Sequence, residues 1–266
     1  MSRSFLALIH FDGTEFLGWQ RQATGRTVQG EVEQVLARLA DRHVTAHGAG
    51  RTDAGVHALG LAVSFAMPES WTPDALRRAL NALLPRDIWV AALSEMRAGF
   101  HARKHAESRR YRYDIGCDDA ASSPFRRKYE WALGRALDPV RLEQAAAFVA
   151  GEHDFRAFSA RTEPRPHYDC RVREARWEQR PHGQGWRFHV EADRFLQHMV
   201  RMLVGTMTDI ALGRRAVEDM PRLLARTDNS ETSPPAPPQG LYFMRAAYPA
   251  DLFSTTGAET GAVAPA

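Results

Sequence analysis

The order of hydrophobic patterns along residues 5–93 constrains the fold of this chain more than any other feature. Continuous apolar runs predict buried strands, and apolar residues recur at helical spacing in two intervening segments. Thr27 can cap the first helix, and Thr72-Pro73 places a proline in the first turn of the second. The expected strands cover residues 5–11, 43–49, 59–65 and 88–93. The resulting order, β-α-β-β-α-β, is that of the ferredoxin-like or split βαβ unit.

The second half of the chain repeats this order without repeating the sequence. The expected elements are a strand (110–115), a helix beginning at Asp138-Pro139, a hairpin (170–179 and 185–192), two helices (196–212 and 216–225) and a strand (240–247). We therefore expect an α/β (α+β) protein with two ferredoxin-like βαββαβ halves around a central, largely antiparallel sheet. The expected halves are 1–100 and 101–250, with an extended surface loop over 230–239 and a disordered tail over 251–266.

Length and composition place the chain among ordinary globular proteins. Of its 266 residues, 44% are hydrophobic and 25% are charged, which excludes collagen, wholesale disorder and a disulfide scaffold. The two cysteines are too few and too far apart for a zinc site, and no run of 18 apolar residues predicts a membrane span. We expect a cytoplasmic protein with reduced thiols and no signal peptide.

The net charge of +3 is small, but the basic residues are clustered. Residues 101–112 contain five Arg or Lys and one acid, and residues 126–128 read Arg-Arg-Lys. Residues 161–176 add five arginines among three acids, whereas the first ninety residues are less basic. Clusters of this kind favour an anionic partner such as nucleic acid.

The segment with the clearest chemical content is Gly48-Ala-Gly-Arg-Thr-Asp-Ala-Gly-Val-His57. Its glycines allow a tight backbone, so the loop presents the Asp53 carboxylate beside the Arg51 guanidinium directly after a strand. The spacing alone leaves a purely structural turn equally open. A phosphate-binding P-loop is disfavoured because its characteristic lysine is absent.

This segment resembles the active-site motif of the TruA-type tRNA pseudouridine synthases. Six further segments resemble the blocks of that family in the same order: 11–22, Thr27-Val-Gln29, Phe100-His-Ala-Arg103, Arg109-Arg-Tyr-Arg-Tyr113, 195–205 and Gly240-Leu-Tyr242. The resemblance covers residues 5–250 and implies the pseudouridine synthase fold, which agrees with the two βαββαβ halves.

The resemblance implies that Asp53 is the essential catalytic residue. The reaction detaches uracil from C1′ of the ribose, rotates the base and rejoins it through C5, so it needs no cofactor and no metal. A carboxylate can attack C1′ or C6, or remove the C2′ proton, and the sequence does not choose among these. The target base must first be extruded from its stack.

The resemblance also implies the other site residues. Arg201 is the basic partner that keeps Asp53 ionised and oriented, and Tyr111 belongs to the uracil pocket, where it stacks on the base or helps to remove the C5 proton. Arg51 contacts the substrate, and the expected RNA contacts are Phe100, His101, Ala102, Arg103, Lys104, Arg109, Arg110, Arg161 and Arg165. The implied substrate is tRNA, modified at uridines 38, 39 and 40 of its anticodon arm, and the implied assembly is a homodimer.

Two other function classes remain as alternatives. Two ferredoxin-like halves also describe a non-catalytic RNA-binding protein with two RRM-like halves, although the aromatic spacing of that module is absent. Three pairs spaced i, i+4, namely His43/His47, Asp53/His57 and His101/His105, would suit a metal-dependent hydrolase. No third ligand recurs near them, so we expect no metal site. Phe16 and Trp19 are expected in the core or in a pocket wall.

Overall fold

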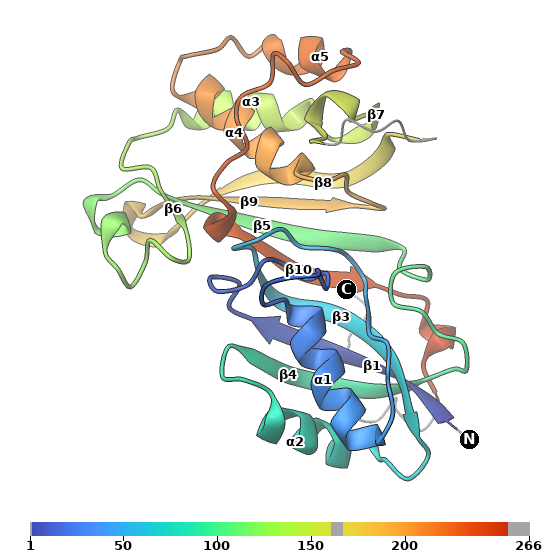
Figure 1. Cartoon of the computed structure of the whole chain (residues 1–266). Helices are drawn as coiled ribbons and strands as arrows, with labels where there is room; N and C mark the ends of the chain where they lie inside the picture. Colours follow the sequence, from blue (N-terminus) through green and yellow to red (C-terminus); the bar gives the residue numbers. More distant parts are fainter. Residues whose placement is uncertain (1, 161–166, 255–266) are drawn as a thin grey trace. The chain divides into compact units, whose positions relative to one another are not determined.

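The computed structural model describes residues 2–160 and 167–254 and divides into two compact units. Unit 1 contains the chain up to Arg109 and again from Phe243 onward, and unit 2 contains Arg110–Tyr242. The described residues form ten strands and five α-helices, with short 3-10 turns between them (Figure 1). Each unit combines helices with antiparallel strand pairs, so the predicted α/β class and largely antiparallel pairing are confirmed.

Unit 1 has the predicted β-α-β-β-α-β order. Its elements are β1 (Ser2–Phe11), α1 (Val28–Ala40), β2 (His47–Gly48), β3 (His57–Pro68), α2 (Pro73–Leu83), β4 (Ile88–Met96) and the end of β10 (Leu241–Ala247). The strands run β4-β1-β3, with both β2 and β10 paired to β3, and β1 is antiparallel to both of its neighbours. The order β4-β1-β3-β2 is that of a ferredoxin-like sheet. Figure 1 shows α1 and α2 side by side on one face of these strands.

Unit 2 follows the β-α-β-β-α part of the motif with additions, and the last strand expected for this half, β10, begins in unit 2 and ends in unit 1. Its elements are β5 (Ser108–Gly116, from Arg110), β6 (Trp131–Ala132), α3 (Pro139–Ala147), β7 (Gly151–Asp154), β8 (Asp169–Gln179), β9 (Gly185–Ala192), α4 (Met199–Ala211) and α5 (Asp219–Leu224). The strands run β5-β9-β8-β7, and the predicted β8–β9 hairpin is antiparallel. Helices α3 and α4 pack against each other. The short strands β6 and β7 were not predicted.

The helix starts follow from local chemistry. The Thr27 hydroxyl accepts a hydrogen bond from the Gly30 N–H at 3.3 Å, and Thr72 caps α2 in the same way. Asp138 accepts hydrogen bonds from two backbone N–H groups of α3, whose first residue is a proline. These caps satisfy donors that have no partner within the helix, which is why the three predicted starts are confirmed.

Of the element boundaries that differ from the prediction, two have identifiable reasons. The strand expected over 43–49 shrinks to the two residues of β2, because the Glu33 and Gln29 side chains of α1 bind the backbone N–H and C=O of Ala46. The helix expected from residue 196 begins only at Met199, because His198 has a φ of 62° and cannot continue a right-handed helix.

Two segments expected to be irregular make specific contacts. In the loop over 230–239, the Pro237 carbonyl accepts the Tyr113 hydroxyl at 2.7 Å, and Ala236 is 2% exposed. The loop is therefore packed rather than a simple surface excursion. Ordered structure also continues past residue 250, where a 3-10 turn places Phe253 in a bridge with Met96. The rest of the expected tail, 255–266, lies outside the described residues.

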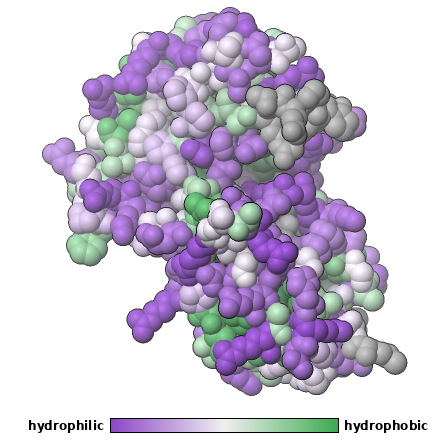
Figure 2. Space-filling view, viewed as in Figure 1, coloured by the Kyte–Doolittle hydropathy of each residue, from purple (hydrophilic) through white to green (hydrophobic). Residues whose placement is uncertain are grey.

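Hydrophilic side chains cover most of the visible surface, and apolar residues form small separate patches (Figure 2). Within residues 2–160 and 167–254, no helix is long and apolar enough to cross a membrane.

Candidate active site

Asp53 lies in the loop over 49–56, between β2 and β3 of unit 1. The Ala49 N–H donates to the Ala62 carbonyl of β3 at 2.8 Å, which fixes the start of the loop. A tight turn follows, in which the Val56 N–H donates to the Asp53 carbonyl at 3.2 Å and Gly55 has a φ of 76°. The positive φ explains the glycine at position 55, as the sequence predicted.

The segment over 11–22 wraps around this loop and holds it. The Trp19 N–H donates to the Thr52 carbonyl at 3.1 Å, and the Gly55 N–H donates to the Phe16 carbonyl at 3.3 Å. Gly18 has a φ of 94°, and a Cβ atom at this position would lie 2.4 Å from the Thr52 oxygen. Only glycine permits this approach, so two of the segments that carry the resemblance, 11–22 and 48–57, pack together.

The three central residues of the loop differ in exposure. Arg51 is exposed, Thr52 is 8% exposed, and Asp53 is half-buried. A half-buried carboxylate on a backbone held at several points is positioned to attack an electrophilic carbon or to accept a proton. The loop geometry therefore suits the catalytic role that the resemblance implies for Asp53.

His57 has a structural role. Its side chain is 2% exposed, and its Nδ1 accepts the Gly13 N–H at 3.0 Å and lies 3.3 Å from an Asp12 carboxylate oxygen. It is thus tied into the segment that supports the loop. Among residues 2–160 and 167–254, no three His, Cys, Asp or Glu side chains are grouped as metal ligands.

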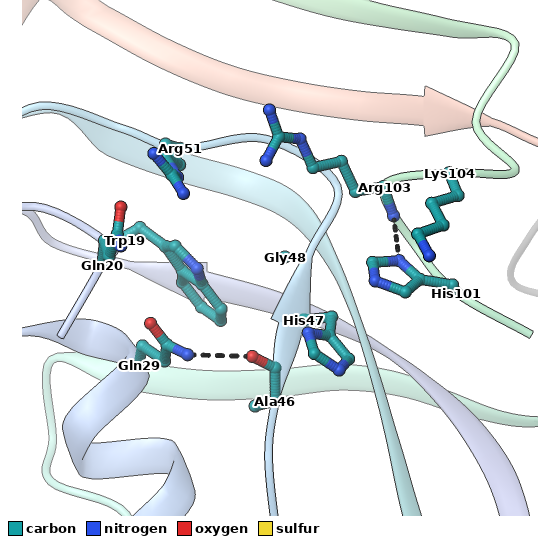
Figure 3. Close-up of a pocket in the computed structure, with 10 residues that line it drawn as sticks. All are labelled: Trp19, Gln20, Gln29, Ala46, His47, Gly48, Arg51, His101, Arg103 and Lys104. Atoms are coloured by element: carbon teal, nitrogen blue, oxygen red, sulfur yellow. Dashed lines mark hydrogen bonds between the residues drawn. The ribbon is translucent and has the colours of Figure 1, made fainter.

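A cavity of about 480 Å³ adjoins the loop within unit 1 (Figure 3). Its floor includes the Trp19 ring, which packs so closely on Gly48 that a Cβ atom there would lie 2.8 Å from the ring. The other lining residues include Gln20, Gln29, His47, Arg51, His101, Arg103 and Lys104. Figure 3 shows the guanidinium groups of Arg51 and Arg103 along one side of the cavity. The expectation that Trp19 forms core or pocket wall is confirmed.

The predicted RNA-binding segment over 100–104 alternates between buried and accessible residues. Phe100 is 8% exposed and packs edge-on against the Tyr248 ring at 5.2 Å. Ala102 is fully buried, and its N–H donates to the Ser64 hydroxyl oxygen at 2.9 Å. These two residues anchor the segment, and the contacts with RNA in this cavity are expected from the three lining residues His101, Arg103 and Lys104.

Arg109 and Arg110, also predicted to contact RNA, are engaged within the protein. The Arg109 guanidinium donates to three backbone carbonyls, those of Ala49 at 3.2 Å, Ala106 at 3.0 Å and Arg103 at 2.5 Å. It thereby connects the start of the Asp53 loop to residues 103–106. Arg110 in unit 2 pairs with Glu191 at 2.8 Å and with Glu174. This geometry favours structural roles for both arginines.

Tyr111 and Arg201 belong to unit 2. Tyr111 on β5 is 7% exposed, and its ring packs edge-on against Phe195 at 4.9 Å. Arg201 on α4 is half-buried, and its Nε donates to the Ala236 carbonyl at 2.7 Å. Their pairing with Asp53, which lies in unit 1, stays a prediction. Two further predicted RNA contacts, Arg161 and Arg165, lie outside the described residues.

Comparisons with known proteins agree with the motifs. Residues 7–103 and 145–249 match the family described as tRNA pseudouridine synthase. A protein named tRNA pseudouridine synthase A from Moorella thermoacetica is 40% identical over 240 residues, covering 90% of this chain and 96% of its own. Proteins of the same name from Geobacter sp. strain M21 and Lysinibacillus sphaericus are 38% and 37% identical, covering 93% and 92% of this chain and 99% and 100% of their own.

The chain belongs to the tRNA pseudouridine synthase family. Membership makes it an isomerase that converts uridine to pseudouridine in tRNA, and the non-catalytic RNA-binding alternative is not favoured. Asp53 and Arg201 lie inside the matched segments, whereas Tyr111 falls in the gap between them.

Sequence reasoning missed several residues that line the cavity of this synthase, namely Gln20, Gln29 and His47. The sequence places His47 only in a histidine pair whose spacing suits a metal. Gln29 is held by the Arg21 N–H at 3.0 Å and by its own bond to Glu33 at 2.9 Å, so it supports the cavity wall. These residues come from separate segments, and no short motif could have grouped them.

Proposed function

We propose that this synthase modifies uridines 38, 39 and 40 in the anticodon arm of tRNA, with Asp53 as the catalytic residue. The observation that carries the proposal is the half-buried Asp53 on a loop held by Trp19 and Phe16, beside a cationic cavity. A rigid carboxylate next to cationic side chains suits a reaction on a base of a polyanionic substrate.

The proposed chemistry conserves all atoms of the nucleotide. The C1′–N1 bond breaks, the uracil rotates, and a C1′–C5 bond forms while C5 releases its proton and N1 takes one up. The Asp53 carboxylate initiates this sequence by attack on C1′ or C6, or by removal of the C2′ proton. Arg201 is proposed to keep the carboxylate ionised and oriented, and Tyr111 to contact the extruded uracil. Arg51 is proposed to contact the substrate from the same loop.

Tritium release from tRNA labelled at uridine C5 tests the catalytic role. Asp53→Asn should lower the release rate by at least about 1,000-fold, as expected for loss of a residue that reacts with substrate, while tRNA binding stays within about twofold. Asp119→Asn removes an exposed carboxylate in unit 2 and serves as the matched control. Release that survives Asp53→Asn would refute the assignment.

Anticodon-arm RNAs that carry one labelled uridine, at position 38, 39 or 40, test the target positions. Release from each of the three RNAs supports the proposal. Release only from uridines elsewhere in tRNA would contradict it.

We also propose that the protein is cytoplasmic and forms a homodimer. Both described cysteines are free thiols, which suits a reducing compartment. Light scattering on the eluted protein should give twice the mass of one chain, and cell fractionation should place it with the cytoplasmic tRNA. A monomeric mass at micromolar concentration would contradict the dimer.

A further inference from the structure

A second cavity, of about 510 Å³, adjoins the first on unit 1. It is lined by residues 42–45 before β2, by His47 of β2, by Ser4 of β1, by part of β3 and by the segment from Gly99 to His101. His47 and His101 are the two residues that line both cavities. The two hollows are therefore adjoining compartments, with this histidine pair between them.

The two imidazole rings are stacked. Their centroids lie 4.4 Å apart and their planes differ by 20°. The Nδ1 of His101 accepts the Arg103 N–H at 3.2 Å, which orients its ring, and the side chain of His47 is exposed. The pair thus forms a small aromatic platform that is held from one side and open from the other.

The charges around both cavities have one sign. The first is lined by Arg51, Arg103 and Lys104, and the second by Arg42. Among the described residues, no Asp or Glu lines either cavity. The neighbouring carboxylate of Glu33 is 5% exposed and is engaged by Arg21 at 3.2 Å and by hydrogen bonds to Ala46 and Gln29. Such a surface attracts a polyanion.

We propose that the two cavities form a groove for two consecutive unpaired nucleotides of the RNA, outside the nucleotide that is modified, with the His47–His101 pair stacked against a base. Each cavity has a volume within the range of roughly 300–1,000 Å³ that is typical of ligand sites. Aromatic platforms beside cationic grooves are the usual means of holding single-stranded nucleic acid. Asp53 lines neither cavity, so the bound nucleotides are neighbours of the target. The inference rests on the proposed function, because it takes tRNA as the ligand.

Substitution of His47 tests the stacking. His47→Ala should raise the Kd for anticodon-arm RNA at least about fivefold, which corresponds to about 1 kcal/mol, near the lower end of base–aromatic stacking. His47→Phe keeps an aromatic face and should bind within about twofold of the unmodified protein. Unchanged binding by His47→Ala, or equal losses in both variants, would overturn the proposed stack.

RNAs with a single abasic nucleotide identify the stacked base. One abasic position should weaken binding to the unmodified protein and cause no further loss in His47→Ala, because both changes remove the same contact. If every abasic RNA binds both proteins more weakly by the same factor, no base stacks on the histidine pair and the inference fails.

A matched arginine pair tests the second cavity. Arg42 lines it, whereas Arg38 is an exposed residue of α1 that lines neither cavity. Arg42→Gln should reduce the slope of log Kd against log salt by roughly 0.7–0.9, as expected for one lost phosphate contact. Arg38→Gln should leave the slope unchanged, and equal slopes for both variants would refute a phosphate contact in the second cavity.

The tritium assay distinguishes a failure of the proposed groove from a failure of the proposed function. If the unmodified protein releases tritium in an Asp53-dependent manner but the His47 and Arg42 variants bind RNA normally, the groove is wrong and the proposed function stands. If the unmodified protein releases none, the proposed function itself fails, whatever the binding results.

Discussion

Arg109 offers the clearest test of how the fold positions the Asp53 loop. Its guanidinium donates to the carbonyls of Ala49, Ala106 and Arg103, so one side chain connects the start of the loop to residues 103–106. Replacement by alanine removes all three hydrogen bonds, and replacement by lysine keeps the charge but loses the planar fork of donors. We predict that both variants are destabilised and that Arg109→Ala is destabilised more than Arg109→Lys.

The size of the effect follows from the contacts. Each bond exchanges a carbonyl–water contact for a carbonyl–guanidinium contact, worth about 1 kcal/mol net, so Arg109→Ala should lose about 3 kcal/mol of unfolding free energy. For a chain of this length, each kcal/mol corresponds to about 2–4 °C, so the melting temperature should fall by about 6–12 °C. Arg109→Lys should lose about half as much, since one ammonium cannot reach all three carbonyls.

Thermal melts and amide hydrogen exchange provide the measurements. Exchange should accelerate over residues 49–56, because the loop loses the hydrogen bonds that connect it to residues 103–106. Arg97→Ala is the control: Arg97 forms an exposed pair with Asp251 at 3.3 Å, and such pairs contribute little. The reasoning would be refuted if Arg109→Ala kept its melting temperature and instead reduced the salt dependence of tRNA binding, the behaviour of a phosphate contact.

Two further predictions concern buried ionisable groups. Glu130 is 3% exposed and pairs with Arg126 at 2.8 Å and with Arg180, so Glu130→Gln should lower the unfolding free energy in urea by about 3–5 kcal/mol, and a loss below about 1 kcal/mol would contradict a buried ion pair. Burial raises the pKa of the Cys117 thiol to about 11 and that of Cys170 to about 12, which keeps both thiols neutral at pH 8. Alkylation by iodoacetamide at pH 8 should therefore be at least about 100-fold slower in the native protein than in urea, and equal rates would contradict the raised pKa values of the two thiols.

The parts of the fold that the sequence predicts well are those decided by neighbouring residues. Thr27 and Asp138 cap helices through bonds to N–H groups two or three residues away, so a short window contains the whole interaction. The glycine-bracketed loop could be recognised for the same reason. The errors arise where residues distant in the sequence determine the local structure. The backbone of Ala46 binds side chains of α1 instead of a strand, and no local pattern reveals this.

The candidate site shows the same division. The motif around Asp53 is continuous in the sequence, so it could be predicted. The cavity beside it could not, because its wall combines Trp19, His47 and His101 from three separate segments. Burial also separates side chains that the sequence treats alike, since Ala102 is a buried anchor although its neighbour His101 lines the cavity.

The distribution of charge changes most between sequence and structure. The count of basic residues places the positive clusters after residue 100, yet Arg110 on β5 faces Glu174 and Glu191, and the Asp114 carboxylate pairs with Arg187 at 2.8 Å. These arginines are partly neutralised by carboxylates of the same unit, so they add less to the field felt by a polyanion. The cations around the two cavities of unit 1 have no acidic lining residue among the described residues. These cations are therefore expected to attract RNA beside the loop that carries Asp53.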